Sequence, residues 1–292
     1  MLLRHIRYLK AVAEHGSFTR AAQALHVSQP ALSQQIKELE DRLGAQLLDR
    51  SGRRVRPTDV GSAYLDRARR ALNELDEAAR AIRDVEDLSV GSLRLGITPS
   101  VAAYLIGPLS QRFWRAHPGI TLSIRVSAQE EIEPSLIDDE LDLGIGFGDL
   151  PSDPIEVTPL HRERVALIVR SQASERSEDA LSAAEIAAMP LAMLDPSFSV
   201  RRLADQYFRA ANLSPRIAVE SNSIPALIEL VRTTDLATIL PTNVCGSGLM
   251  VIPTDPAFDS RPAALLRRRD AYCSAAARAF IATTQQVAAG FA

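Results

Sequence analysis

Apolar residues in the first sixty positions recur at the spacing of α-helices, and short polar turns separate the runs. The first run predicts a helix over residues 2–15, which Gly16 ends. Ser17 or Thr19 can cap a second, short helix through residues 21–25, because either hydroxyl can accept a hydrogen bond from a first-turn amide. The pattern therefore predicts short helices in this part of the chain.

A third helix is predicted over residues 28–44, with Ser28 as its N-cap and Gly44 at its end. Its buried stripe consists of Leu32, Ile36, Leu39 and Leu43. Its other face carries polar residues in the N-terminal half, namely Gln29, Pro30, Ser33, Gln34 and Lys37. Such residues at a helix N-terminus can read base edges in the major groove of DNA, and the helix dipole there favours phosphates. The alternative is the solvated face of an ordinary three-helix domain.

A basic hairpin is predicted after the third helix. Residues 47–50 and 53–56 flank Ser51-Gly52, which predicts a two-residue turn. Arg50, Arg53 and Arg54 then lie at the tip of the hairpin, where arginines suit phosphates or a narrow minor groove. The candidate DNA contacts are therefore Arg20, Ser28, Gln29, Pro30, Ser33, Gln34, Lys37, Arg50, Arg53 and Arg54.

A long helix is predicted over residues 59–89, with Thr58 as its N-cap, because neither proline nor glycine occurs between Gly61 and Gly91. Apolar residues form a heptad seam along it: Leu65, Ala68, Leu72, Leu75, Ala79 and Ile82. We interpret this helix as a dimerisation rod, because nothing near it in the sequence is expected to cover the seam. The alternative is a long helix that packs on its own domain.

After Gly91, short apolar runs typical of strands alternate with helical spacing. The first set is predicted as strand 93–97, helix 101–115, strand 120–126, helix 131–139 and strand 141–147. The second set is predicted as strand 164–169, helix 182–188, strand 191–194, helix 200–211, strand 217–219, helix 224–232 and strand 237–240. A strand at 264–266 and a helix at 275–288 follow. This alternation predicts an α/β body of two lobes with mostly parallel sheets.

Composition and charge divide the chain in the same place. Its 292 residues are 46% hydrophobic, enough for two or three domains with buried cores. Residues 1–58 hold ten basic and five acidic side chains, whereas the whole chain has a net charge of -3, and this asymmetry favours a nucleic-acid-binding head. No apolar run is long enough for a membrane span, and no signal peptide is recognisable at the start. With only Cys245 and Cys273, a cytoplasmic location is expected.

The stretch AVAEHGSFTRAAQALHVSQPALSQQIKELEDRLGAQLLDRSGRRVRPTDVG, residues 11–61, resembles the signature of LysR-type transcriptional regulators. The resemblance implies a winged helix-turn-helix, a linker helix and a two-lobed effector domain similar to periplasmic binding proteins. The chain end is then expected to return to the first lobe. The implied boundaries are 1–58 for the DNA-binding domain, 59–89 for the linker helix, 90–161 with 264–292 for lobe I, and 162–263 for lobe II. A dimer or dimer of dimers and contact with RNA polymerase are also expected.

Ligands of open α/β sheets bind beyond the carboxyl ends of the strands. Residues at such places match positions that line effector pockets in this family: Thr98, Ser100, Gln129, Phe147, Ser199, Arg201 and Thr242. The hydroxyls of Thr98 and Ser100 lie at a helix start, which favours an anion, although a simple helix cap is the alternative. Arg201 matches an often basic position and can bind an anionic effector, although a surface arginine is the alternative.

A narrower resemblance links the chain to the subgroup that regulates cyanate operons. It rests on stretches such as DDELDLGIGF at 138–147 and ESNSIPALIELVRTTDLATILP at 220–241. The second stretch departs from the Gly-Leu-Gly run common in the family. The resemblance to this subgroup implies cyanate, a small linear anion, as the effector. The alternatives are a regulator of an unrelated operon with another effector and an effector-independent DNA-binding protein.

Catalytic patterns are weak in this sequence. Gly144, Gly146 and Gly148 lack the spacing and the helix start of a dinucleotide fingerprint, and no nucleophile elbow or phosphate loop is present. The five histidines are scattered, without the spacing of metal ligands. We therefore expect neither an enzyme nor a metal or cofactor, although a solute-binding protein or enzyme with an incidental basic head remains the third alternative.

Overall fold

The computed structural model describes residues 3–52, 54–84, 91–148, 153–171, 180–269 and 271–291. The chain forms two compact units, Met1–Ile82 and Arg83–Ala292. Within the described ranges, no helix combines the length and the apolar character needed to cross a bilayer.

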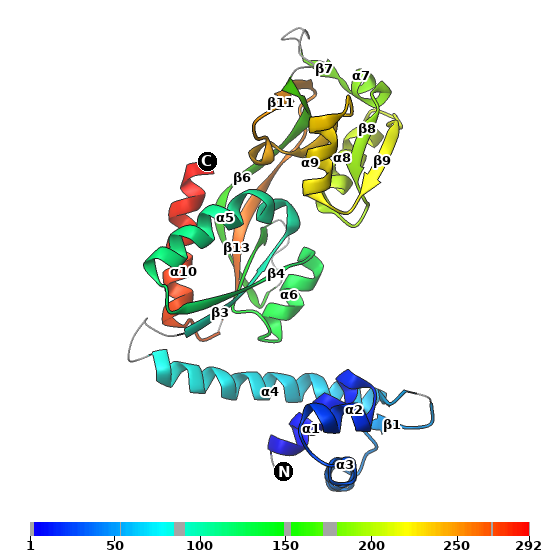
Figure 1. Cartoon of the computed structure of the whole chain (residues 1–292), viewed down its shortest axis with the longest axis vertical. Coiled ribbons are helices and arrows are strands. Elements are labelled where there is room, and N and C mark those ends of the chain that lie inside the picture. Colours follow the sequence, from blue (N-terminus) through cyan, green and yellow to red (C-terminus); the bar gives the residue numbers. More distant parts are fainter. Residues whose placement is uncertain are drawn as a thin grey trace. The chain divides into compact units, whose positions relative to one another are not determined.

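The N-terminal unit contains the three predicted short helices, followed by a small β-ribbon and a long helix (Figure 1). Its elements are α1 (Leu3–His15), α2 (Phe18–Ala24), α3 (Gln29–Leu43), β1 (Leu48–Asp49), β2 (Arg56–Pro57) and α4 (Asp59–Asp84). Ser17, and not Thr19, caps α2, and Ser28 caps α3 as predicted. The predicted stripe residues Leu32, Ile36 and Leu39 are fully buried in the core of this unit, whereas Leu43 at the end of α3 is exposed.

The β-ribbon is more open than the predicted two-residue hairpin. Among the described residues, only Leu48 and Asp49 pair with Pro57 and Arg56, so the connection between the two strands is longer than two residues. The Asp49 carboxylate accepts hydrogen bonds from both the amide and the hydroxyl of Ser51, which turns the chain before further strand pairs can form. The predicted hairpin is thus present, but its predicted two-residue length at Ser51-Gly52 is wrong.

Helix α4 begins at Asp59, and Thr58 caps it by accepting a hydrogen bond from the Gly61 amide at 2.9 Å. A Cβ at Gly61 would lie 1.9 Å from the carbonyl oxygen of Leu47, so only glycine permits this close approach. The helix thus starts in direct contact with the β-ribbon.

The head itself covers the first part of the predicted seam on α4. Leu65 belongs to the core of the head, and Ala68 and Leu72 pack with Ile6 of α1. Leu75, the next seam residue, is 47% exposed. The prediction that nothing nearby covers the seam is therefore wrong for its first three positions. The side chains of Ala79 and Ile82 lie outside the described part of the chain.

The C-terminal unit is an α/β domain of two lobes (Figure 1). Lobe I contains β3 (Gly91–Ile97), α5 (Pro99–Ala116), β4 (Ile120–Val126), α6 (Gln129–Ile137), β5 (Leu143–Phe147) and α10 (Ala275–Ala288). Lobe II contains β7 (Leu181–Ser182), α7 (Ala183–Ala188), β8 (Leu191–Leu194), α8 (Ser199–Ala210), β9 (Ile217–Ser221), α9 (Ile224–Thr233), β10 (Thr238–Pro241), η2 (Thr242–Val244), β11 (Leu249–Ile252) and β12 (Thr254–Asp255). The short helix η3 (Ala289–Phe291) follows α10.

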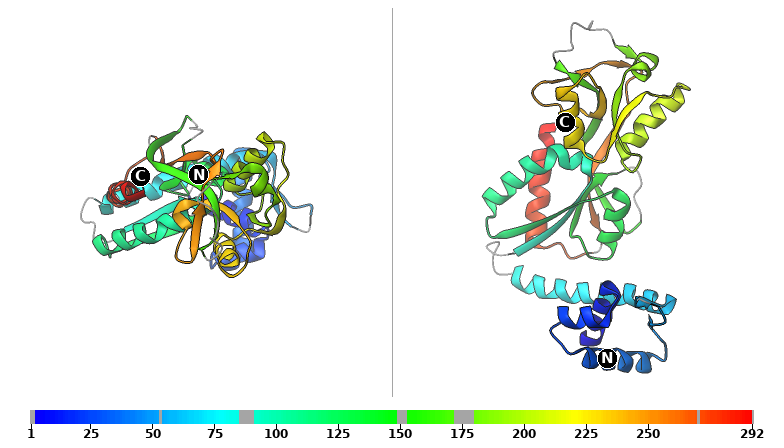
Figure 2. Two further views of the ribbon diagram at one scale, coloured as in Figure 1. Left: turned by 90° about the horizontal axis from the view of Figure 1, so that it is seen from above. Right: turned by 45° about the vertical axis from the view of Figure 1, so that its right-hand side comes forward.

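Two long strands, β6 (Ile155–Arg170) and β13 (Ser260–Arg268), join the lobes. Residues 155–164 of β6 pair with β13, and residues 165–170 pair with β10 and β11. The right-hand view in Figure 2 shows the ribbon continuing from one lobe into the other. The sequence predicts only 164–169 and 264–266 as strand here, so the predicted lobe boundaries fall inside these two strands.

Strand direction is mixed. Strand β3 is parallel to β4 and β5, and β8 is parallel to β9, as predicted. Strand β13 is antiparallel to β5 and β6, and β10 and β11 are antiparallel to β6. The strands that run between the lobes thus reverse the direction expected from the α/β alternation.

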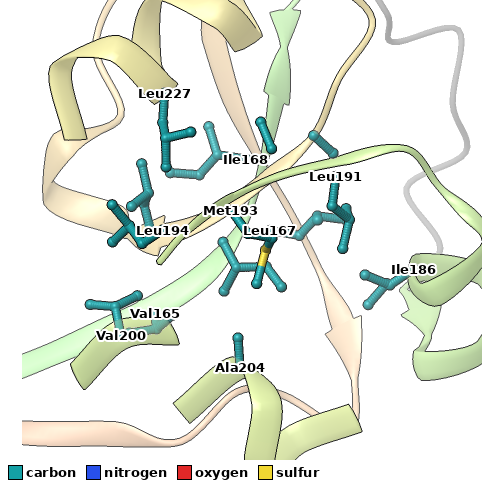
Figure 3. Packing of buried hydrophobic residues seen from close by; sticks show 14 of the residues in the cluster. Val165, Leu167, Ile168, Ile186, Leu191, Met193, Leu194, Val200, Ala204 and Leu227 are labelled. Carbon is teal, nitrogen blue, oxygen red and sulfur yellow. The ribbon is translucent and has the colours of Figure 1, made fainter. Parts of the chain in front are cut away.

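Each lobe has its own apolar core. In lobe I, Phe113 of α5 contacts Phe280 of α10, so the last helix packs on this lobe. In lobe II, residues of β6 and β8 pack against α8 and α9, as Val165, Met193, Ala204 and Leu227 show in Figure 3. The first turns of α5 and α8 are thereby anchored in the cores of lobe I and lobe II.

Candidate functional site

The polar face of α3 is open to solvent. Gln29, Pro30, Gln34 and Lys37 are exposed, and Ser33 is half-buried, whereas Leu32 and its stripe face the core. Together with Glu38 and Asp41, these residues line a shallow groove along the helix. No intramolecular partner is seen for the side chains of Gln29, Gln34 or Lys37 among the described residues, so their polar groups are free for a ligand.

The predicted basic residues around this face differ in what they contact. Arg54 is exposed, and Arg53 lies outside the described residues. Arg20 donates a hydrogen bond to the carbonyl oxygen of His15 at 2.6 Å. Arg50 binds the Glu40 carboxylate at 2.7 Å and lies over the ring of Phe18, so its charge is neutralised within the head.

Glu40 is a structural residue that the sequence analysis missed. Its carboxylate is buried and accepts the amides of Leu47 and Leu48 at 2.8 and 3.1 Å, in addition to the bond from Arg50. It therefore joins the end of α3 to the start of the β-ribbon. An acidic residue on the buried side of an otherwise apolar stripe is the only signal that could have indicated this role.

Two cavities lie between the lobes of the C-terminal unit. The smaller, of about 330 Å³, is bounded by the starts of α5, α6 and α8 and is lined by Thr98, Ser100, Gln129 and Ser199, all of which were predicted. The larger, of about 870 Å³, is more open and is lined by Gln129, Phe147, Ser199 and Arg261 among others. The structure thus brings together five of the seven predicted effector residues.

Arg261 of β13, which was not predicted, lies at the meeting point of the lobes. Its guanidinium donates to the Ser199 hydroxyl of lobe II at 2.7 Å and to the Glu163 carboxylate. The Ser100 hydroxyl of lobe I is 3.5 Å away, and the Phe147 ring centroid lies 3.8 Å from the guanidinium carbon. This buried side chain therefore contacts the helix starts of both lobes.

Gln129 acts on the backbone of Phe147. Its side-chain amide donates to the Phe147 carbonyl at 2.6 Å, and its side-chain oxygen accepts the Phe147 amide at 2.7 Å. A Cβ at Gly146 would lie 2.7 Å from that side-chain oxygen, so glycine leaves room for this clasp. Gln129 thus fixes the end of β5 at the cavity, and Gly144 and Gly146 allow close packing of α6 on the sheet.

Arg201 and Thr242 do not take the predicted places. Arg201 is buried and binds Asp205, Glu220 and the carbonyl oxygen of Leu194, at 2.6 to 2.9 Å. These bonds satisfy its charge and turn it away from both cavities, so the prediction that it binds an anion is wrong. Thr242, in η2, donates to Asn243 at 3.2 Å and lines neither cavity.

A buried polar cluster lies beneath the cavities. Burial raises the pKa of Glu163, although the Arg261 guanidinium opposes this shift, and the carboxyl is fully buried. The Tyr104 hydroxyl lies 2.8 Å from Nε2 of His161, and burial raises the pKa of Tyr104 and lowers that of His161. The charged pattern of residues 161–164 ahead of an apolar strand was the available signal for this cluster.

Among the described residues, no three His, Cys, Asp or Glu side chains come together as metal ligands would. Cys245 and Cys273 are both free thiols, and burial raises the pKa of Cys245.

Comparisons with known proteins agree with the fold of each unit. Residues 3–62 match the bacterial regulatory helix-turn-helix of the LysR family, and residues 86–289 match the LysR substrate binding domain. The chain is similar in fold to full-length CbnR in complex with its target DNA, with a TM-score of 0.69 and 24% identity over 98% of this chain and 100% of that one.

Two relatives extend the comparison at the level of sequence. The SDS degradation transcriptional activation protein of a Pseudomonas species is 36% identical over 83% of this chain and 79% of its own length. A probable RuBisCO transcriptional regulator of Trichormus variabilis is 29% identical over 95% of this chain and 86% of its own length. Neither is a cyanate regulator, so the narrower resemblance to that subgroup is not supported. The chain belongs to the LysR family of DNA-binding transcriptional regulators, which are not enzymes.

Proposed function

We propose that this regulator reads its operator with the polar face of α3 and changes its DNA complex when a small anion binds between the lobes. Gln29 and Gln34 supply amides that suit adenine, Ser33 supplies a tolerant hydroxyl, and Lys37 suits a phosphate. Arg54 of the β-ribbon adds a phosphate contact to those of α3. Arg50 is left out of this set because Glu40 neutralises it.

The observation that carries the effector part is the cavity of about 330 Å³, which is lined by residues of both lobes. Its wall includes the starts of α5 and α6 in lobe I and the start of α8 in lobe II. A ligand that contacts both lobes stabilises the lobe arrangement in which those contacts form, and thereby shifts the population of conformations.

The remaining parts of the proposal concern assembly and gene target. We propose that the part of α4 that carries the exposed seam residue Leu75 pairs two chains, so that two heads read half-sites about one helical turn apart. The dimers pair again into a tetramer that recruits RNA polymerase in the cytoplasm. The relatives named for SDS degradation and RuBisCO regulation favour a metabolic operon as the target.

The test is a footprinting titration of the purified full chain on a duplex from upstream of its own gene, with excess random competitor DNA. Cyanate, acetate and methyl sulfate are the added anions. We expect competitor-resistant binding and a footprint that changes with at least one anion. Specific binding that no anion changes would favour the effector-independent alternative, and binding without preference over the competitor would contradict the DNA-reading role.

Gln29→Ala and Thr98→Val separate the two roles in the same titration. Gln29→Ala is expected to lose preference for the operator while unfolding at the wild-type temperature. Thr98→Val is expected to bind the operator as wild type does but to respond less to the anion. A loss of operator binding by Thr98→Val would contradict the assignment of the cavity to the effector alone.

A further inference from the structure

The three helices that border the cavity of about 330 Å³ between the lobes begin without side-chain caps. The N-cap positions of α5, α6 and α8 are Thr98, Ala128 and Phe198, and none supplies a side-chain hydrogen bond to the first turn. In the other described α-helices of this unit, α7, α9 and α10, a serine hydroxyl caps each first turn. Among the described α-helices of the unit, the uncapped starts are thus the three that border the cavity.

Uncapped helix starts leave backbone amides without an acceptor, and each carries a partial positive charge. A ligand with oxygen acceptors can satisfy several of these amides at once. The predicted alternative for Thr98, a simple helix cap, is excluded by its lack of a cap bond.

A buried hydroxyl on the cavity wall gives independent support for a ligand. Thr98 is only 3% exposed, and no partner for its hydroxyl oxygen exists among the described residues. The hydroxyl of Ser127, on the same wall, is also buried without a partner. Buried polar groups are nearly always hydrogen-bonded, and these two hydroxyls lie on the wall of a cavity, where a polar ligand can supply the missing bonds.

The charged side chains around the cavity limit the charge of that occupant. Those on the wall are Glu130, Glu131 and Arg202, and Arg202 is already bound to Glu130 at 2.9 Å. Arg261, next to the wall, is bound to the buried Glu163. No described guanidinium at the cavity is therefore free to neutralise a second negative charge.

The wall also has an apolar part, to which Pro99, Phe198 and Val200 contribute. A cavity of this volume lies at the small end of ligand pockets. Together, these observations leave room for one compact acceptor group and a few methylene groups.

We infer that the cavity binds a small monoanion with an oxygen-rich head and a short aliphatic tail. The head accepts hydrogen bonds from the helix starts and from Thr98 and Ser127, and the tail lies against Phe198 and Val200. This inference rests on the proposed effector role of the cavity and specifies the class of effector.

The test compares three compounds with the same tail: n-butyl sulfate, a monoanion; n-butyl phosphate, largely a dianion at pH 8; and 1-butanol, which is uncharged. Binding to the full chain is measured at pH 8 and constant ionic strength by calorimetry and by the rise in melting temperature. We expect n-butyl sulfate to bind about tenfold or more tightly than either other compound. Equal or tighter binding of the phosphate or the alcohol, or no binding of any of the three, would overturn the inference.

Thr98→Val removes the unpartnered hydroxyl without changing the shape of the side chain. Thr238→Val is the matched control, because Thr238 is equally buried, has an equally unpartnered hydroxyl and lies in β10 away from the cavity wall. We expect Thr98→Val to weaken n-butyl sulfate binding about tenfold and Thr238→Val to change it by less than about twofold. Equal effects of the two variants would show that the hydroxyl on the wall does not bind the ligand.

Failure of this inference is distinguishable from failure of the proposed function. If the wild-type footprint on the upstream duplex persists and changes with another compound while n-butyl sulfate does not bind, only the ligand class is wrong. If wild type shows no preference for that duplex, the proposed function is wrong whatever the butyl compounds do.

Discussion

The face of α3 and the cavity between the lobes both display polar groups at helix starts, but they differ in whether their basic side chains have carboxylate partners. On α3, Lys37 is exposed and has no intramolecular partner among the described residues. At the lobe junction, Arg201, Arg202 and Arg261 are each bound to at least one carboxylate. The free cation suits a polyanion such as DNA, and the paired ones suit a ligand of low charge. Arginine content alone therefore does not identify an anion site.

The largest expected effect comes from breaking a pair at the lobe junction. Arg261→Ala leaves the fully buried Glu163 without its partner and should lower the free energy of unfolding of the C-terminal unit by about 3–5 kcal/mol. Urea unfolding of the full chain measures it. The double variant Arg261→Met with Glu163→Gln removes both charges and should recover most of the loss. A double variant as unstable as Arg261→Ala would mean that the pair is not the source of the effect.

The next effect concerns base recognition on the open face. Gln29→Ala should reduce discrimination at one base pair by about 1–3 kcal/mol, because a bidentate amide contact is lost. Selection of binding sites from random duplexes measures this change. Gln23→Ala on α2, which is also exposed, is the control and should leave the preferred sequence unaltered. An unchanged preference in Gln29→Ala would place base reading on another element.

Two arginines of the β-ribbon sharpen the comparison within the head. Arg54→Ala should weaken binding to all duplexes and reduce the slope of log affinity against log salt by about 1, because an exposed phosphate contact is lost. Arg50→Ala should leave the slope nearly unchanged and instead destabilise the head, because Glu40 loses its partner. Salt titrations and thermal melts of both variants test this. Similar slopes for the two variants would contradict the distinction.

The smallest expected effect is a change in pH dependence. Burial lowers the pKa of His161 in the folded chain below its usual value of 6.5. Above that pH both states are neutral, but as the pH falls through it only the unfolded chain takes up the proton, so stability is lost. His161→Gln cannot titrate, and its melting temperature should fall less than that of wild type between about pH 8 and about pH 5.5. Parallel curves for the two proteins would contradict a neutral, buried His161.

Local signals predicted much of the fold and part of the site. Ser17 and Ser28 mark helix starts through bonds made within one turn, and Thr98, Ser100 and Ser199 follow from their place after strands. For Arg201, the prediction overlooked a signal in the sequence. Asp205 lies four residues later on the same helix, and this spacing indicates an ion pair within the helix.

Other features depend on partners that are distant in the sequence. Glu163 and Arg261 are 98 residues apart and meet because β6 pairs with β13. Strand β6 itself extends well beyond its apolar run, since its first half is stabilised by pairing rather than by continuous burial. No pattern within a window of the sequence contains this information.

The contact between α4 and the head has a consequence for engineered chimeras. A graft of this head onto another effector domain, joined where the basic segment ends near residue 58, would remove Leu65 from the core of the head and leave Ile6 without Ala68 and Leu72. The recombination point should therefore lie beyond Leu72. The segment that must be transferred to move DNA specificity to another protein is therefore longer than the helix-turn-helix, because it includes the first part of α4. Hybrids that contain this whole segment should fold.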